Sequence, residues 1–293
     1  MNVIILNGKR ISADQAGLSA GDRGLLYGDG LFETMRVERG APLFLEGHLD
    51  RLEEGSRVLR FASLPEREEL RAGVVAAVRS NGVYSGYLRL TVTRGVGGFG
   101  TPLARLDQPS YWVEAREHPL DLRRYDRGIS AATVSIRRNP ASPLCRVKSL
   151  NYLESVLARE EAVGLGADEA LFLTTEGDVC EGASANLFIV HKGRLITPDL
   201  TRGPLPGTVR RWVVENAARL GFPVKERWVE REEVFEAEGV FFTNSTWGPF
   251  PCVEVDGSVI GTGKPDPITR QLIRQWRVMI EAIPERGDRA PSE

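Results

Sequence analysis

The feature that most constrains the fold is the irregular succession of short strand-like and longer helix-like segments. "NVIILNGKRIS" predicts a β-hairpin with Asn7-Gly8 at its tip, because Asn-Gly suits a two-residue hairpin turn. "LFETMRVERGAPLFL" predicts a second strand pair, with "ERGAP" between the strands. Apolar spacing then predicts two helices, over 46–61 and 67–82, before two strands over 86–95 and 110–117.

The second half of the chain follows the segment "EHPLDLRRYDRG", whose Pro, charges and Gly predict a linker. A strand over 128–138 is expected to lead into a helix within "RVKSLNYLESVLAREEA", with Leu150, Leu153 and Leu157 as its apolar series. Residues 167–198 read as three strands joined by Gly turns, and "PGTVRRWVVENAARLG" is the clearest helix. A strand over 223–230, a short helix over 231–237 and a strand over 239–245 follow, and "PERGDRAPSE" reads as a frayed tail.

Length and composition narrow the class of protein. A chain of 293 residues predicts one large or two medium domains. The 38 Lys and Arg against 40 Asp and Glu argue against a nucleic-acid partner or a membrane surface bound through gross charge. No apolar run is long enough for a membrane span and "MNVIIL" is no signal peptide, so a cytoplasmic location is expected.

Several common sites are disfavoured. Cys145, Cys180 and Cys252 fit neither a disulfide framework nor a zinc site and read as reduced thiols, while the three histidines lack metal spacing, so no metal is expected. "GVGGFG" over 95–100 matches a dinucleotide-binding motif, but the prolines after it exclude the helix that such a site needs. A flexible active-site loop or a plain turn fits this segment better.

Three local features carry chemistry, each with an ordinary alternative. Lys148 is either a solvated lysine near a helix start, where a cation is poorly placed, or an amine that attacks a carbonyl, with Arg146 on the same strand face lowering its pKa. The helix start at Gly207-Thr208 is either a plain cap or a phosphate site. Glu181 is either a solvated turn residue or a buried carboxylate paired with a cation or a protonated ring nitrogen.

An amine, a phosphate site and a buried carboxylate together meet the needs of pyridoxal phosphate (PLP). The chain here resembles the class IV aminotransferases, the fold type IV PLP enzymes. The resemblance runs in order through "NGKRI", "DRGLLYGDGLFETMRV", "HLDRL", "RVKSLNYLESVLARE", "EGASANLF", "PGTVRR" and "FFTNSTWGPFP". It implies an α+β fold of two domains: a small N-terminal α/β domain (1–118), a linker (119–125) and a larger cofactor-binding domain (126–293) with strands wrapped by helices.

The resemblance also assigns roles to residues at the motif positions. Lys148 is the catalytic residue, which forms the imine with the cofactor aldehyde and later shuttles the proton, and Glu181 pairs with the pyridine nitrogen. Tyr152 hydrogen-bonds the phenolic oxygen. The phosphate is held by Arg51, Gly207, Thr208, Val209 and Ser245, although the family usually reads Gly-Ile-Thr-Arg where this chain has Gly-Thr-Val-Arg, so the hydroxyl of Thr208 has moved one position. Candidates for the substrate are Tyr27, Phe32, Thr34, Arg36, Arg89, Arg94 and Thr246.

Two reactions remain open, because both begin at the same residues. "GDGLFETMRV", "SIRRN" and "TNS" resemble aminodeoxychorismate lyases, which favours β-elimination to 4-aminobenzoate and pyruvate on the folate route. Against the lyase, Phe99 stands where many lyases have a carboxylate-binding arginine, and "YLR" resembles the substrate strand of branched-chain aminotransferases. The alternative is a transaminase of branched-chain or D-amino acids with 2-oxoglutarate; a non-catalytic carrier of the cofactor is disfavoured by Lys148 and Glu181. The resemblance also implies a homodimer.

Overall fold

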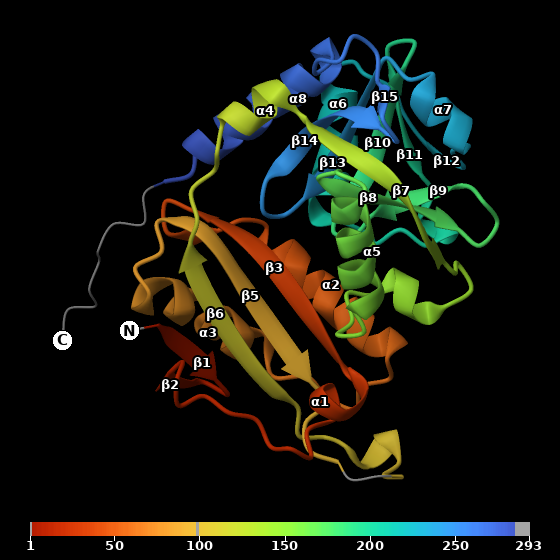
Figure 1. Cartoon of the computed structure of the whole chain (residues 1–293). Coiled ribbons are helices and arrows are strands. Elements are labelled where there is room, and N and C mark those ends of the chain that lie inside the picture. Colours follow the sequence, from red (N-terminus) through yellow and green to blue (C-terminus); the bar gives the residue numbers. More distant parts are fainter. Residues whose placement is uncertain (1, 98–99, 285–293) are drawn as a thin grey trace. The chain divides into compact units, whose positions relative to one another are not determined.

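The computed structural model describes residues 2–97 and 100–284 (Figure 1). Phe99 and nearly all of the expected C-terminal tail lie outside these residues, as does part of the expected loop over 95–100. The described chain packs as two compact units, one made of residues 2–120, Val147–Asn151 and 279–284, the other of Asp121–Arg146 and Tyr152–Val278. Relative to the expected domains, the segment around Lys148 is grouped with the N-terminal unit. None of the described helices is long and apolar enough to cross a membrane.

The first unit is built on a six-stranded sheet in the order β2-β1-β6-β5-β3-β4, in which all neighbouring strands are antiparallel. Asn7 and Gly8 have φ of 46° and 75°, as the predicted hairpin turn requires. The elements are β1 Val3–Leu6, β2 Lys9–Ser12, α1 Arg23–Tyr27, β3 Gly30–Glu38, β4 Ala41–Pro42, α2 Leu45–Val58, α3 Arg67–Ser80, β5 Ser85–Thr93 and β6 Ser110–Glu117.

Helices α2 and α3 cover one face of this sheet, and Figure 1 shows them behind β3, β5 and β6. Alternate residues of each strand point to this face, so Leu31, Met35 and Val37 of β3 join Leu49 of α2 and Val74 of α3 in one apolar core. Phe32, Thr34 and Arg36 therefore lie on the opposite face. Strand β3 thus carries core residues on one side and candidate substrate residues on the other.

The second unit contains the remaining elements. They are α4 Arg123–Arg127, β7 Ile129–Arg138, α5 Leu153–Gly164, β8 Glu169–Thr174, β9 Val179–Gly182, β10 Asn186–His191, β11 Arg194–Pro198, α6 Thr208–Arg219, β12 Val224–Arg227, α7 Arg231–Phe235, β13 Gly239–Asn244, β14 Gly248–Val255, β15 Ser258–Val259 and α8 Pro267–Glu281. The last residues of α8, from Met279 on, are grouped with the first unit.

The nine-stranded sheet of this unit runs in the order β12-β11-β10-β13-β14-β7-β8-β9, with β15 added beside β14. The pairs β11–β12, β7–β8 and β14–β7 are parallel and the others antiparallel. The Val179 N–H of β9 donates to the Val229 carbonyl, just after β12, at 2.9 Å. Strands β9 and β12 end the strand order, so this bond joins the two ends of the sheet. The sheet thus curls back on itself around an apolar core that includes Leu187 and Phe242.

The structure corrects four sequence-based expectations. Residues 167–198 form four strands (β8 to β11), since the turn after Thr174 separates β8 from β9. The expected linker contains the short helix α4, which is anchored by the buried ring of Tyr125. The second strand of this pair is only the two residues of β4, which lie inside "ERGAP" and not after it, because α2 begins at Leu45. The apolar residues Leu153 and Leu157 of α5 are more than half exposed and do not form a core face.

Candidate active-site residues

Lys148 lies in an extended segment that pairs with the start of β3. The Phe32 N–H donates to the Lys148 carbonyl at 2.9 Å, and the Leu150 N–H donates to the Gly30 carbonyl at 2.9 Å. Gly30 is required here, because a Cβ would lie 2.6 Å from Leu150 Cδ1 and 2.6 Å from the Val92 carbonyl oxygen. The segment is therefore held by backbone hydrogen bonds at Lys148 itself and two residues after it.

Two premises about Lys148 were wrong. Helix α5 begins only at Leu153, so Lys148 is not at a helix N-terminus and its charge does not oppose the helix dipole there. Arg146 is the last residue of a 3₁₀ turn over Pro143–Arg146, so the two residues do not share a strand face. Residues two positions apart in the sequence point to the same face only where the backbone is extended.

Lys148 instead shares an aromatic neighbour with Arg89. Its Nζ lies 4.4 Å from the centroid of the Phe32 ring, and the Arg89 Cζ lies 3.8 Å from the same centroid. Phe32 is only 3% exposed, so the two cations meet a desolvated ring, which strengthens cation–π attraction. Thr34 is the cross-strand partner of Arg89 and lies on the same face. The structure thus brings Lys148, Phe32, Thr34 and Arg89 together within the first unit.

Arg51 is held by a buried carboxylate that the sequence did not reveal. Glu33 of β3 accepts two hydrogen bonds from Arg51, Nε to Oε1 at 2.8 Å and Nη2 to Oε2 at 2.5 Å. The Nδ1 of His48, which precedes Arg51 by one turn of α2, lies 2.6 Å from Glu33 Oε2. Glu33 and His48 are each 1% exposed, so the cluster sits in the core beneath the sheet.

The neighbouring charges in this cluster shift the pKa values of Glu33 and His48 and so determine which of the two groups is ionised. Burial alone raises the pKa of Glu33, but the Arg51 guanidinium and His48 outweigh it and lower this pKa to about 2. Burial lowers the pKa of His48, assisted by the charges of Arg51 and Lys148, although Glu33 opposes the shift. Glu33 is therefore ionised and His48 favours its neutral form at neutral pH. A fixed negative charge then orients Arg51.

The other two arginines proposed to bind the substrate, Arg36 and Arg94, are hydrogen-bonded to other groups of the protein. Arg36 is 1% exposed and donates to Glu38 Oε1 at 2.7 Å and to Ser85 Oγ at 2.8 Å. Arg94 is 3% exposed and donates to Asp29 Oδ2 at 2.8 Å, and its remaining nitrogens bond carbonyls that follow α2. Both side chains stabilise the first unit. Tyr27 is 42% exposed at the end of α1, with the Arg23 Cζ 4.6 Å from its ring centroid.

Glu181 is the buried carboxylate of the second unit. It lies near the end of β9, is 7% exposed, and its Oε2 accepts the Leu205 N–H at 2.9 Å. Its Oε1 lies 3.6 Å from the Nε of Arg138, the last residue of β7, which also stacks on the Phe172 ring with its Cζ 4.1 Å from the centroid. The carboxylate is therefore held by a backbone amide and faces a guanidinium, so its burial is compensated.

Tyr152 lies immediately before α5 and near the same carboxylate. Its hydroxyl donates to the Ala183 carbonyl at 2.9 Å. Burial, with the negative charge of Glu181, raises the pKa of the Tyr152 phenol to about 12. The phenol thus stays protonated at neutral pH and acts as a hydrogen-bond donor.

The predicted phosphate site at the start of α6 has the expected local form. The helix begins at Thr208, and its N-cap, Gly207, has no side chain that could bond the first-turn amides. The first-turn amides of such a helix lack acceptors within the helix and point toward its N-terminal end. Gly207 is required because a Cβ would lie 2.0 Å from Asn186 Oδ1, while Asn186 Nδ2 donates to the Leu205 carbonyl at 2.7 Å. The loop that bonds Glu181 thus also sets the start of this helix.

Two hydroxyls meet at this helix start. Thr208 Oγ1 and Ser245 Oγ lie 3.2 Å apart, and Thr208 is 4% exposed. The turn that holds Ser245 is built on Asn244 Oδ1, which accepts from the Thr246 N–H at 3.0 Å and from its hydroxyl at 2.8 Å. Although the threonine is one position from its usual place in the motif, its hydroxyl still reaches Ser245. Thr246 is held by this turn.

The chain belongs to the class IV amino-transferase family, whose sequence pattern it matches over residues 30–255. It is 33% identical to the branched-chain-amino-acid aminotransferase of Pseudomonas aeruginosa over 273 residues, 89% of this chain and 87% of that protein. The 4-amino-4-deoxychorismate lyase of the same species has a similar structure, with a TM-score of 0.84 and 35% identity, covering 94% of this chain and 98% of that one.

A branched-chain amino acid aminotransferase from T.th., solved with pyridoxamine 5'-phosphate, matches with a TM-score of 0.88 and 29% identity over 95% of this chain and 94% of that one. The predicted family, the α+β fold of the fold type IV enzymes and the PLP cofactor are thereby confirmed. This chain is a PLP-dependent enzyme of class IV.

Sequence reasoning missed four residues that hold the site: Glu33, His48, Arg138 and Asn186. All four stand inside quoted motifs, and Glu33 is next to Phe32 and Thr34, which were assigned roles. An acidic residue at a position where strand alternation predicts burial is a signal that could have found Glu33. Asn186 and Arg138 carry no such signal, because their roles depend on contacts between distant segments.

Proposed function

We propose that this enzyme is an aminotransferase that moves the amino group of an amino acid with an apolar side chain to 2-oxoglutarate. The observation that carries the proposal is the buried Phe32 ring, which both Lys148 and Arg89 contact in the first unit. An amino acid of this kind presents a single carboxylate beside the reacting carbon. Arg89, on the Phe32 ring that also contacts Lys148, suits one carboxylate, and the buried ring suits an apolar side chain.

The described residues fit the cofactor chemically. Lys148 supplies the amine, Glu181 a buried carboxylate for a protonated ring nitrogen, and Tyr152 a phenol that stays protonated. Gly207, Thr208 and Val209 open a helix whose N-cap is a glycine, and the backbone amides at a helix start can bind a phosphate. Bound PLP supplies an electron-poor ring that stabilises negative charge on the substrate carbon.

The protein groups then have separate tasks. Lys148 binds the cofactor aldehyde and carries the proton away from the substrate carbon and back. Glu181 keeps a proton on the ring nitrogen. Arg51, oriented by Glu33, and the Thr208–Ser245 hydroxyl pair hold the phosphate. Arg89 orients the substrate carboxylate.

The second candidate function is 4-amino-4-deoxychorismate lyase, which the motifs favoured. It is supported by the 35% identity to the Pseudomonas aeruginosa lyase. That substrate carries two carboxylates, but so does 2-oxoglutarate, so the engagement of Arg36 by Glu38 and of Arg94 by Asp29 does not separate the two functions. The lyase takes second place because the buried Phe32 ring beside Lys148 suits an apolar side chain.

A direct assay separates the two functions. The purified holoenzyme is incubated with L-leucine, L-valine or D-alanine, each with and without 2-oxoglutarate, and separately with aminodeoxychorismate alone. We expect an apolar amino acid to bleach the visible absorption of the cofactor and 2-oxoglutarate to restore it with formation of glutamate. Release of pyruvate and 4-aminobenzoate without an acceptor would select the lyase. The Lys148→Ala variant should lack the visible band and both activities.

We also propose that two copies of the chain associate, as the family resemblance implies. Helix α5 supports this because Leu153, Val156 and Leu157 are each at least half exposed and lie within one turn of each other. Such a patch is costly in water and is typical of an interface. Analytical ultracentrifugation should show a dimer that Leu157→Asp converts to monomer, whereas Glu160→Asp on the same helix should not.

A further inference from the structure

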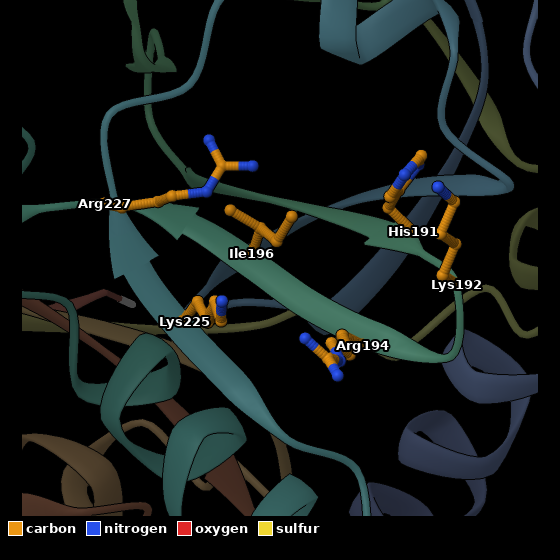
Figure 2. Close-up of a pocket in the computed structure, with 6 residues that line it drawn as sticks. All are labelled: His191, Lys192, Arg194, Ile196, Lys225 and Arg227. Atoms are coloured by element: carbon orange, nitrogen blue, oxygen red, sulfur yellow. The ribbon is translucent and has the colours of Figure 1, made fainter.

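The second unit carries a cavity of about 300 Å³ that none of the proposed catalytic residues lines. Figure 2 shows five basic side chains grouped around the apolar side chain of Ile196. The basic residues are His191, Lys192, Arg194, Lys225 and Arg227. The chain as a whole has slightly more acidic than basic residues, so this local excess of positive charge does not follow from composition.

Strand register brings these residues together. His191 of β10 is directly opposite Arg194 of β11, and Ile196 of β11 is directly opposite Lys225 of β12. Directly opposite residues point to the same face of a sheet, and side chains two positions apart on one strand share that face. Basic groups placed opposite one another or around one apolar residue repel each other once charged, which costs stability.

The neighbouring acids offset little of this charge. Arg227 is paired with Glu233, with Nη1 2.9 Å from Oε1, and Glu238 accepts the backbone N–H of Lys192 at 3.1 Å. Within residues 2–97 and 100–284, no carboxylate makes an ion pair with the side chains of His191, Lys192, Arg194 or Lys225. Three permanent cations and a histidine therefore face the cavity without an ion-paired acid in the described part of the chain.

Protection of a sheet edge explains only part of the cluster. Lysine and arginine on an edge strand discourage strand addition, and β12 is such an edge, which accounts for Lys225 and Arg227. Arg194 and His191 stand one and two strands further in, where no edge of the described sheet needs protection. Their presence around the same hollow needs a different reason.

We propose that this cavity binds a small molecule that carries a di- or triphosphate group. The basic groups extend over two interstrand spacings, roughly 10 Å, which a chain of phosphates spans better than a single phosphate. Arginine and lysine are the residues that bind phosphate oxygens. Ile196, which also lines the cavity, is 5% exposed and belongs to the apolar core beneath the basic groups. The site is separate from the phosphate site proposed at the start of α6.

Calorimetric titration of the PLP-loaded enzyme tests the proposal, because the bound cofactor already fills its own phosphate site. The probes are inorganic tripolyphosphate, ATP, uncharged adenosine and poly-glutamate, without added metal. The test variant is R194A with K225A. The matched control is R219A with R274A, which removes the same charge from exposed positions on α6 and α8 of the same unit. We expect one tripolyphosphate per chain, with affinity about tenfold lower in the test variant and within about twofold in the control.

The outcomes are distinguishable. Tighter binding of ATP than of tripolyphosphate assigns a nucleotide, and equal binding assigns the phosphate chain alone; both support the site. The proposal is overturned if both double variants lose the same affinity for tripolyphosphate, or if the enzyme does not bind tripolyphosphate at about millimolar concentration. It is also overturned if poly-glutamate binds more tightly than tripolyphosphate, which would indicate an acidic protein partner. The variant R194K with K225R should retain binding, and thermal unfolding with the cofactor spectrum confirms that each variant is folded.

Discussion

Each unit of this enzyme buries a glutamate that we place near the cofactor beside an arginine, Glu33 with Arg51 and Glu181 with Arg138, and the two pairs differ in how tightly they are joined. Glu33 accepts two hydrogen bonds from Arg51, at 2.8 and 2.5 Å, and a third contact from His48. Glu181 accepts a backbone N–H at 2.9 Å, while the Arg138 Nε stays 3.6 Å away. The same residue types thus make a closed ion pair in one unit and a looser one in the other.

The difference indicates different tasks. A buried glutamate with close bonds to a guanidinium and an imidazole is a structural anchor, and removal of its charge leaves a buried arginine uncompensated. A carboxylate that is fixed by a backbone amide, with its arginine 3.6 Å away, suits a partner for a cofactor ring. Substitution should therefore affect activity most at Glu181 and stability most at Glu33.

The largest effect is expected from Glu181→Gln. The amide cannot stabilise a protonated ring nitrogen, so kcat should fall by about 100- to 1000-fold while the free energy of unfolding changes by about 1 kcal/mol or less. Glu154→Gln is the matched control, because Glu154 also pairs with Arg138, at 3.2 Å, but is exposed. Steady-state kinetics and denaturant unfolding measure both quantities. Equal activity of the two variants would remove the proposed role of Glu181.

Glu33→Gln should act mainly on stability. Loss of the charge beneath Arg51 should lower the free energy of unfolding by about 3 kcal/mol and weaken PLP binding through a misplaced Arg51. Glu46→Gln is the control: Glu46 also bridges two arginines, Arg67 and Arg71, but its side chain is 56% exposed, so the loss should be about 1 kcal/mol or less. If both variants lose the same stability, Glu33 is not the anchor that we infer.

The pH dependence of stability should follow the same cluster. The folded pKa of Glu33 is about 2, below its ordinary 4.5, so its contribution is complete above pH 4.5 and lost as the pH falls toward 2. The pKa of His48 is also lowered, from 6.5, so acid begins to favour the unfolded chain below that pH. Urea unfolding of the wild type should show falling stability below about pH 6.5. In Glu33→Gln the part below pH 4.5 should be much reduced; an unchanged curve would contradict the assignment.

The smallest effect is expected from Tyr152→Phe, in the environment of Glu181. The phenol has a pKa of about 12 and does not titrate in the working range. Its removal should lower kcat/KM by about tenfold, the value of one lost hydrogen bond, without changing the shape of the pH–rate profile. Tyr84→Phe, at an exposed position, is the control. A change in the shape of the profile would show that the phenol does titrate.

The parts predicted well from sequence depend on near neighbours. The Asn7-Gly8 turn and the α6 helix with Gly207 before it follow from backbone preferences and from apolar spacing within a few residues. Ordered motifs then identified the family and the cofactor. Such features survive in any tertiary context, so the linear chain contains enough information to find them.

Other features were decided only by the tertiary structure. The segment around Lys148 reads as the start of a helix, but it pairs with β3 because Gly30 allows a close approach that no local pattern encodes. Glu33 reaches Arg51 because strand alternation turns it toward α2, and the basic cavity exists because three strands align in one register. The amino-acid sequence by itself determined which chemical groups this enzyme carries. Their partners were decided by the packing of sheets and helices, because burial and register depend on residues far apart in the chain.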